Sequence, residues 1–265
     1  FHMWTPDVYE GAPTSVTAFM AVGAKIGGFA ALIRIFIGTL PPEAATVWVP
    51  VIAVMSALTM IIGNVMALTQ TNVKRMLGYS SIAQAGYILM ALAADPFTGN
   101  GVPAALYYML AYLFTTLGAF AIIIMVENPA YAKVNLEDYK GLARQNTAVA
   151  VTLSLFMFSL IGIPLTGGFV GKFFVFGATI QAGLVWLAII GVLTSVISAF
   201  YYLRLVVYMF MFEGDVARET MSRALTTTAV IAAVATLILG IVPTPWLNLA
   251  QQAIMLTTQT LIAGG

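Results

Sequence analysis

Two lysines stand inside otherwise apolar stretches of this sequence. Lys25 lies in "AVGAKIGGFAAL" and Lys172 lies in "FVGKFFVFGA". At the centre of a membrane an ammonium group costs roughly 2.5 kcal/mol or more, even on the scales most tolerant of charge. A lysine there needs a partner, or it must be able to release its proton. The second property is the chemistry of a proton relay, so both lysines are candidate relay sites.

Lys172 follows a predicted break in a helix. The segment "GIPLTGG" (162–168) contains Pro164, which lacks an amide, and three glycines that weaken a helix. The helix that restarts there presents unpaired N–H groups and its positive end, which both disfavour a nearby ammonium. These features favour a proton relay beside a hydrated break. The alternative is a structural lysine that bonds the open carbonyls of the break.

The other candidates have simpler alternatives. Lys25 could extend toward the membrane surface or serve packing. Lys74 begins a helix beside Arg75, where anchoring of a basic loop explains it as well as a relay does. Three polar residues at membrane depth could hold water between the lysines or bridge helices: Asn64, Gln84 and Gln181.

Several kinds of site are excluded by composition. No Asp or Glu falls inside a predicted span. A carboxylate partner for a buried lysine would therefore come from sequence or subunits absent from this chain. The chain has no cysteine and one histidine, His2. This excludes disulfides and iron–sulfur clusters and disfavours a histidine metal or haem site. The near-zero net charge of +1 gives no basic surface for nucleic acid.

The elements that hold these residues are predicted to be membrane helices. Hydrophobic residues make up 61% of the 265 residues and charged residues 8%, a composition typical of an integral membrane protein. Apolar runs long enough to span are 14–37, 47–70, 73–94, 103–126, 184–212 and 225–242, and the longer run 147–182 is expected to form a broken helix. We therefore predict an all-α polytopic fold of about seven spans, with an amphipathic tail at 246–262 along the interface.

Loop charges predict the orientation. Seven basic residues fall in the loops of one side: Lys74, Arg75, Lys133, Lys140, Arg144, Arg218 and Arg223. The opposite loops, "GTLPPEAA", "DPFTGNG" and "QAG", have no Lys or Arg. Positive residues collect in cytoplasmic loops, so the first side is predicted to be cytoplasmic.

Four motifs carry a resemblance to a known family. They are "FHMWTPDVYEGAPT" (1–14), "GNVMALTQTNVKRMLGYSSIAQAGY" (63–87), "LTGGFVGKFFVF" (165–176) and "LTSVISAFYYLRLV" (193–206). In this order they resemble the antiporter-like proton-translocating membrane subunits of respiratory complex I, NADH-quinone oxidoreductase. The stretch "WTPDVYEGAP" favours the subunit N branch. Gln84 departs from relatives that have histidine there.

The resemblance implies a fourteen-helix fold of two inverted repeats, of which this N-terminally incomplete chain would hold the C-terminal half. Residues 1–46 would be a cytoplasmic motif loop and the last helix of the first repeat. Residues 47–212 would be the second repeat with its broken helix at 147–182, and 213–265 a closing helix and tail. A glutamate and a first lysine would lie in the missing half.

The implied function is proton translocation coupled to quinone reduction, with Lys25 and Lys172 as relay sites and Lys74 as a possible third. The chain would be a non-redox subunit of a translocase, without cofactor; quinone, flavin and iron–sulfur clusters would belong to partner subunits. Other membrane-arm subunits would be its partners, in a bacterial plasma membrane rather than a thylakoid or similar membrane. Two rivals stay open: a Na⁺/H⁺ antiporter-type or hydrogenase-linked complex without quinone chemistry, and a purely structural scaffold.

Overall fold

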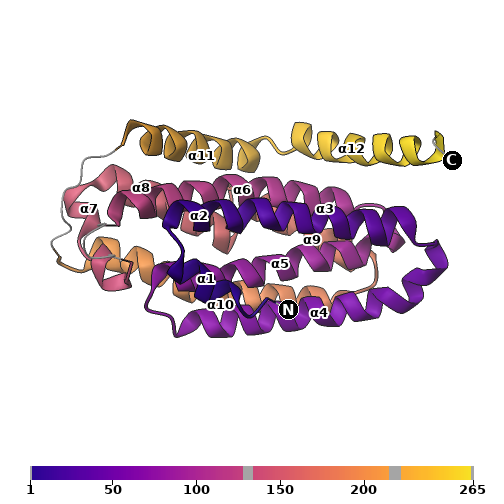
Figure 1. The fold of residues 1–265 in the computed structure, drawn as a ribbon, viewed down its shortest axis with the longest axis horizontal. Coiled ribbons are helices and arrows are strands. Elements are labelled where there is room, and N and C mark those ends of the chain that lie inside the picture. The colour runs from indigo at the N-terminus through magenta and orange to yellow at the C-terminus, as the bar shows by residue number, and fades with distance from the viewer. Residues whose placement is uncertain (1, 128–133, 215–221, 264–265) are drawn as a thin grey trace.

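The computed structural model describes residues 2–127, 134–214 and 222–263. Within these ranges the chain is helical without any strand, apart from one isolated bridge between Asn72 and Asn135. The long helices lie side by side along the long axis of the molecule (Figure 1). The predicted all-α fold is confirmed.

Six helical runs are long and apolar enough to cross a membrane. The first, Thr14–Thr39, joins α2 (Thr14–Phe19), the π-helix η1 (Met20–Ala24), α3 (Lys25–Ile33) and the π-helix η2 (Arg34–Thr39). The others are α4 (Ala45–Leu68, after a short 3₁₀ turn), α5 (Val73–Thr98), α6 (Gly101–Val126), α10 (Val185–Met211) and α11 (Arg223–Ile241). With the broken helix, these match the seven predicted spans.

The predicted break is also present. Helix α8 (Thr147–Ile161) ends at Gly162, whose φ of 93° lies in the left-handed region that favours glycine. Helix α9 (Gly167–Gln181) begins after Thr166, whose hydroxyl accepts from the Phe169 amide at 3.4 Å. Gly162 and Pro164 lie between these two half-helices, and Gly167 and Gly168 are the first residues of α9.

Helix α5 lies at the centre of the bundle, with α4, α6 and α9 packed around it. Glycines permit the close approach of α4 and α5. A β-carbon at Gly63 would lie 2.7 Å from the Ala83 backbone nitrogen, and one at Gly86 would lie 3.0 Å from the Met60 backbone nitrogen. This packing fixes the depth of the polar side chains on α5.

The tail after the prolines forms a further helix. Helix α12 (Thr244–Ala263) continues along the same edge of the bundle as α11 (Figure 1). Its residue Leu247 packs near Tyr107 and Leu239, and Gln251 lines a cavity with Asn100 and Gln181. The first turns of α12 therefore pack on α6, and the placement of the tail along the membrane interface stays a prediction.

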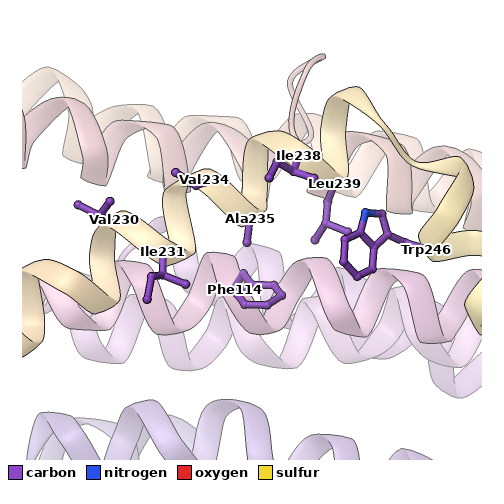
Figure 2. Close-up of a pocket in the computed structure, with 8 residues that line it drawn as sticks. All are labelled: Phe114, Val230, Ile231, Val234, Ala235, Ile238, Leu239 and Trp246. Carbon is purple, nitrogen blue, oxygen red and sulfur yellow. The ribbon is translucent and has the colours of Figure 1, made fainter.

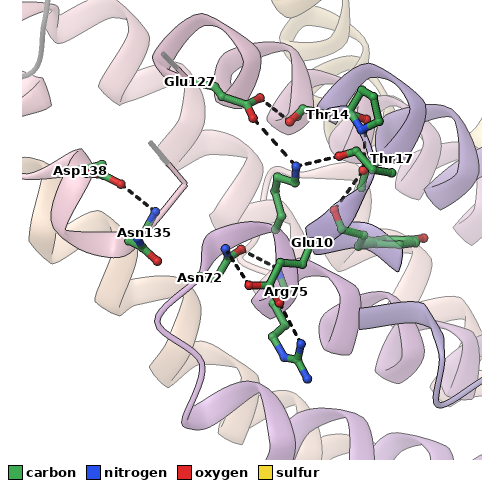
Figure 3. Close-up of polar contacts among 12 residues, drawn as sticks. Glu10, Thr14, Thr17, Asn72, Arg75, Glu127, Asn135 and Asp138 are labelled. Atoms are coloured by element: carbon green, nitrogen blue, oxygen red, sulfur yellow. Dashed lines mark hydrogen bonds and ion pairs between the residues drawn. The ribbon is translucent and has the colours of Figure 1, made fainter. Parts of the chain in front are cut away.

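Ion pairs gather the charged loops at one end of the bundle, which we call the basic end. Arg75 pairs with Asp7 of α1 (Thr5–Gly11) at 2.7 Å and with Glu10 at 2.8 Å (Figure 3). Arg144 of α7 (Leu142–Gln145) pairs with Glu213 at 2.6 Å. The predicted loops thus share one end; Lys133 and Arg218 lie outside the described residues.

The assignment of the basic end to the cytoplasm leads to a labelling prediction. Cysteine introduced at Lys140 should resist a membrane-impermeant thiol reagent in intact cells and react after permeabilisation, because basic loops stay inside. The chain contains no cysteine, so the background from this chain is zero. Cysteine at the exposed Asn100, at the opposite end, is the matched control and should react in intact cells. Labelling of the Lys140 site in intact cells would contradict the orientation.

Candidate functional site

Lys172 bonds the open carbonyls of the break. Its Nζ donates to the Leu160 carbonyl at 3.0 Å, to the Ile161 carbonyl at 2.9 Å and to the Ser195 hydroxyl at 2.8 Å. The residue is 4% exposed. The last carbonyls of a helix have no intrahelical partner, and the break leaves these two free for the lysine. Three acceptors match the three donors of an ammonium.

The same surroundings can also hold the neutral amine. The Ser195 hydroxyl lies 3.1 Å from the Ile161 carbonyl, to which it can donate. Because a hydroxyl can donate or accept, it can turn its hydrogen toward Nζ when the amine has a free lone pair. The Tyr87 ring centroid lies 4.8 Å from Nζ and favours the charged form. The geometry therefore fits both a relay and the structural role, and only a functional measurement separates them.

Lys25 occupies a similar kind of site on the first span. It is half-buried, directly after the π-helix η1. Its Nζ donates to both the carbonyl and the hydroxyl of Ser81 at 2.7 Å and lies 4.2 Å from the Tyr112 ring centroid. π-Helical turns are frequent at functional sites because they redirect side chains. As with Lys172, its contacts among the described residues are a carbonyl, a hydroxyl and an aromatic ring, without a carboxylate.

A row of polar groups lies between the two lysines. Ser81 neighbours Ser80, whose hydroxyl bonds that of Tyr202. The Gln84 amide lies 3.3 Å from the Tyr202 hydroxyl and 3.4 Å from the Leu160 carbonyl, the same carbonyl that Lys172 binds. We call Ser81, Ser80, Tyr202 and Gln84 the polar row. Of these the sequence singled out only Gln84.

The other two polar residues make different contacts. Asn64 donates to the Met60 carbonyl of its own helix and accepts from the Tyr201 hydroxyl at 2.9 Å, so it bridges α4 and α10. Gln181 lies near Asn100 at 3.4 Å, beside a cavity of about 260 Å³ at the end opposite the basic end. Asn64 fits the alternative of a helix bridge, and the role of these residues in holding water stays a prediction.

Lys74 lies apart from both lysines, at the basic end. It is 4% exposed, and its Nζ donates to the Ala12 carbonyl at 2.8 Å and lies 3.9 Å from Glu127 Oε1. Thr14 donates a hydrogen bond to the other oxygen of Glu127 (Figure 3). Glu127 directly follows α6, outside the predicted spans. The sequence therefore did not indicate this carboxylate as a partner of a buried lysine. This arrangement anchors the start of the first span.

Comparisons with known proteins agree with this architecture. Residues 1–198 match the family model described as NADH:quinone oxidoreductase/Mrp antiporter, TM. NADH-quinone oxidoreductase subunit N of Trichlorobacter lovleyi is 46% identical over 258 residues, which cover 97% of this chain and 52% of that protein. The subunit N of Chloroflexus aggregans is 45% identical, with 96% and 52% covered.

Solved structures share the fold. A chain of respiratory complex I from Thermus thermophilus with bound aureothin matches at TM-score 0.80 and 35% identity, covering 94% of this chain and 54% of that one. A chain of the archaeal membrane-bound sulfane sulfur reductase matches at TM-score 0.84 and 27% identity, covering 98% and 53%. The chain spans about half the length of the curated relatives it matches. With the family model covering most of its residues, the chain belongs to the NADH:quinone oxidoreductase/Mrp antiporter family of membrane proteins.

Proposed function

We propose that this chain is part of a proton-translocating membrane subunit of a bacterial NADH-quinone oxidoreductase, in which Lys172 and Lys25 exchange protons. The observation that carries the proposal is the polar row that lies between two lysines at membrane depth, with hydroxyl and carbonyl partners in place of carboxylates. Ionisable residues inside a membrane mark ion pathways by default. The subunit N relatives supply the reaction class.

The polar row is not a continuous chain of hydrogen bonds, because no contact joins the Ser81 and Ser80 side chains among the described residues. Hydroxyls of Ser81, Ser80 and Tyr202 can both accept and donate a proton. Gln84 presents its amide to the Leu160 carbonyl, and a carbonyl only accepts. The Gln84 amide donates hydrogen bonds but does not take up a proton. Transfer between Tyr202 and Lys172 therefore needs water molecules or a movement of the lysine side chain. A break with open backbone groups is a place where water can bind.

The electron-transfer chemistry is assigned to other subunits. We propose that quinone, flavin and iron–sulfur clusters are held by partner chains, and that this chain contacts other membrane-arm subunits and the lipids of the plasma membrane. Lys74 is a possible third relay residue, at the basic end beside Glu127. Its role would be to exchange protons with the cytoplasmic side.

The second candidate function is cation/proton exchange, because the family model covers Mrp antiporters as well as the oxidoreductases. In that case the chain would serve a cation/proton exchange complex without quinone chemistry. The same two lysines would then respond to a second cation rather than to electron transfer. A scaffold role, the third alternative, would make both lysines dispensable.

Purification of the full-length protein in a gentle detergent distinguishes these functions. We expect flavin- and iron–sulfur-containing subunits to copurify and the preparation to reduce quinone with NADH. Reconstituted vesicles should then acidify internally during turnover. Copurification of membrane chains alone, with Na⁺-dependent proton exchange, would instead support the antiporter function.

A further inference from the structure

Helix α11 packs along α6 and also contacts α8 and α9. Its buried residues are few, one per turn or less: Ala229, Ala232, Thr236 and Leu239. Beside this stripe an apolar groove of about 350 Å³ opens between α11 and Phe114 of α6, with Trp246 at its end (Figure 2). Each alanine of the stripe buries little apolar surface, so hydrogen bonds add to what fixes the position of α11.

The end of α11 lies directly against the break between α8 and α9. A β-carbon at Gly240 would collide with the Leu165 carbonyl, and one at Gly167 would lie 2.9 Å from the Leu239 β-carbon. The Tyr107 hydroxyl donates to the Leu239 carbonyl. Backbone at the end of one helix thus packs on backbone at the start of another, without side chains between them.

A set of buried hydroxyls connects the same helices. Thr115 Oγ1 of α6 lies 3.0 Å from Ser159 Oγ of α8 and 3.5 Å from Thr236 Oγ1 of α11. Ser159 Oγ in turn accepts from the Gly168 amide of α9 at 3.2 Å. Each of the three hydroxyl residues is at most 1% exposed. Four helices therefore meet through hydrogen bonds at the break.

These contacts end one residue from the Lys172 site. Ser159 directly precedes Leu160, and the carbonyls of Leu160 and Ile161 accept from Lys172. A change in the separation of α8 and α9 would therefore change the distance from Nζ to these carbonyls. Buried hydrogen-bonded networks fix a geometry more tightly than apolar contacts do.

We propose that Thr115 and Thr236 are positioning residues for Lys172: they hold the closing helix α11 against the break and so set the separation of α8 and α9. The expected change in proton transfer by Lys172 rests on the proposed function. The expected change in the separation of α8 and α9 does not. Neither threonine hydrogen-bonds to Lys172 among the described residues, so both act through Ser159 and Gly168.

The test compares Thr115→Val with Thr115→Ser in the full-length, assembled complex. Valine keeps the shape and removes the hydroxyl, while serine keeps the hydroxyl. Amide hydrogen exchange of 162–172 should be about five-fold faster in the valine variant and near the original rate in the serine variant. The coupled rate of quinone reduction should fall by a similar factor with valine and recover with serine.

Thr116→Val is the matched control. Thr116 Oγ1 is also buried on α6 but has no hydrogen-bond partner in the part of the chain that the structure describes. Its removal should leave exchange at 162–172 unchanged. Unchanged exchange in Thr115→Val, or an equal rise in Thr116→Val, would overturn the positioning role. Faster exchange with undiminished coupling would support that role and count against proton transfer by Lys172.

Discussion

Lys172→Met should leave a complex that assembles but has lost coupled turnover by about 100-fold, at the low end of what a positioned proton-transfer group contributes. Methionine keeps the length and apolar character of the side chain and removes the titratable group. It also leaves the Leu160 and Ile161 carbonyls without their lysine donor, at a cost of about 1 kcal/mol each. Assembly is checked on a native gel, and coupling by quinone reduction with proton uptake into vesicles.

Two further substitutions at Lys172 separate proton transfer from structure. Glutamine offers an amide donor to the carbonyls but cannot carry the proton, so we expect it to assemble well and remain inactive. Arginine keeps a permanent charge and cannot release its proton, so we expect it to be as harmful as methionine. If Lys172→Arg retained full pumping and quinone reduction, a fixed charge that bonds the break would be the correct description.

Lys25→Met should have the second largest effect, a loss of coupled turnover of at least about ten-fold. The expected loss is smaller because Lys25 is only half-buried among the described residues, whereas Lys172 is buried. Its partner Ser81 joins it to the polar row, and Ser81→Ala should produce a milder loss in the same assay.

The matched control for Lys25 lies on the same span. Arg34 is exposed near the end of the span opposite the basic end, where a long cationic side chain can reach the membrane surface. Arg34→Gln should therefore retain most of the coupled rate. Equal losses in both variants would indicate that removing any cation from this span disturbs it, and would remove the evidence for a relay at Lys25.

The features that the sequence predicted are those with a local signature. Spans follow from hydropathy, and the α8–α9 break from Pro164 and its neighbouring glycines. The pattern of basic loops grouped residues that the structure places at one end. In each case a short stretch of chain carries the physical cause, so no knowledge of distant contacts is needed.

The contacts that complete the site had no such signature. Ser81 and Tyr202 are ordinary residues on membrane helices until the fold brings one to Lys25 and the other to Gln84. Glu127 lies outside every span, and its approach to Lys74 depends on where α6 ends relative to α5. The packing of Gly240 on Leu165 likewise depends on the depth of two helices far apart in sequence.

The location of the ion pairs has a consequence for how the two faces respond to salt. All five pairs among the described residues lie at the basic end, and most of their partners are substantially exposed. At the other end, Asp95 is satisfied by the Val102 amide at 2.7 Å rather than by a cation. At 0.15 M ionic strength, charges are screened over about 8 Å, and exposed pairs weaken further as salt rises. Raising the ionic strength will therefore loosen the loops of the basic face and leave the opposite face unaffected.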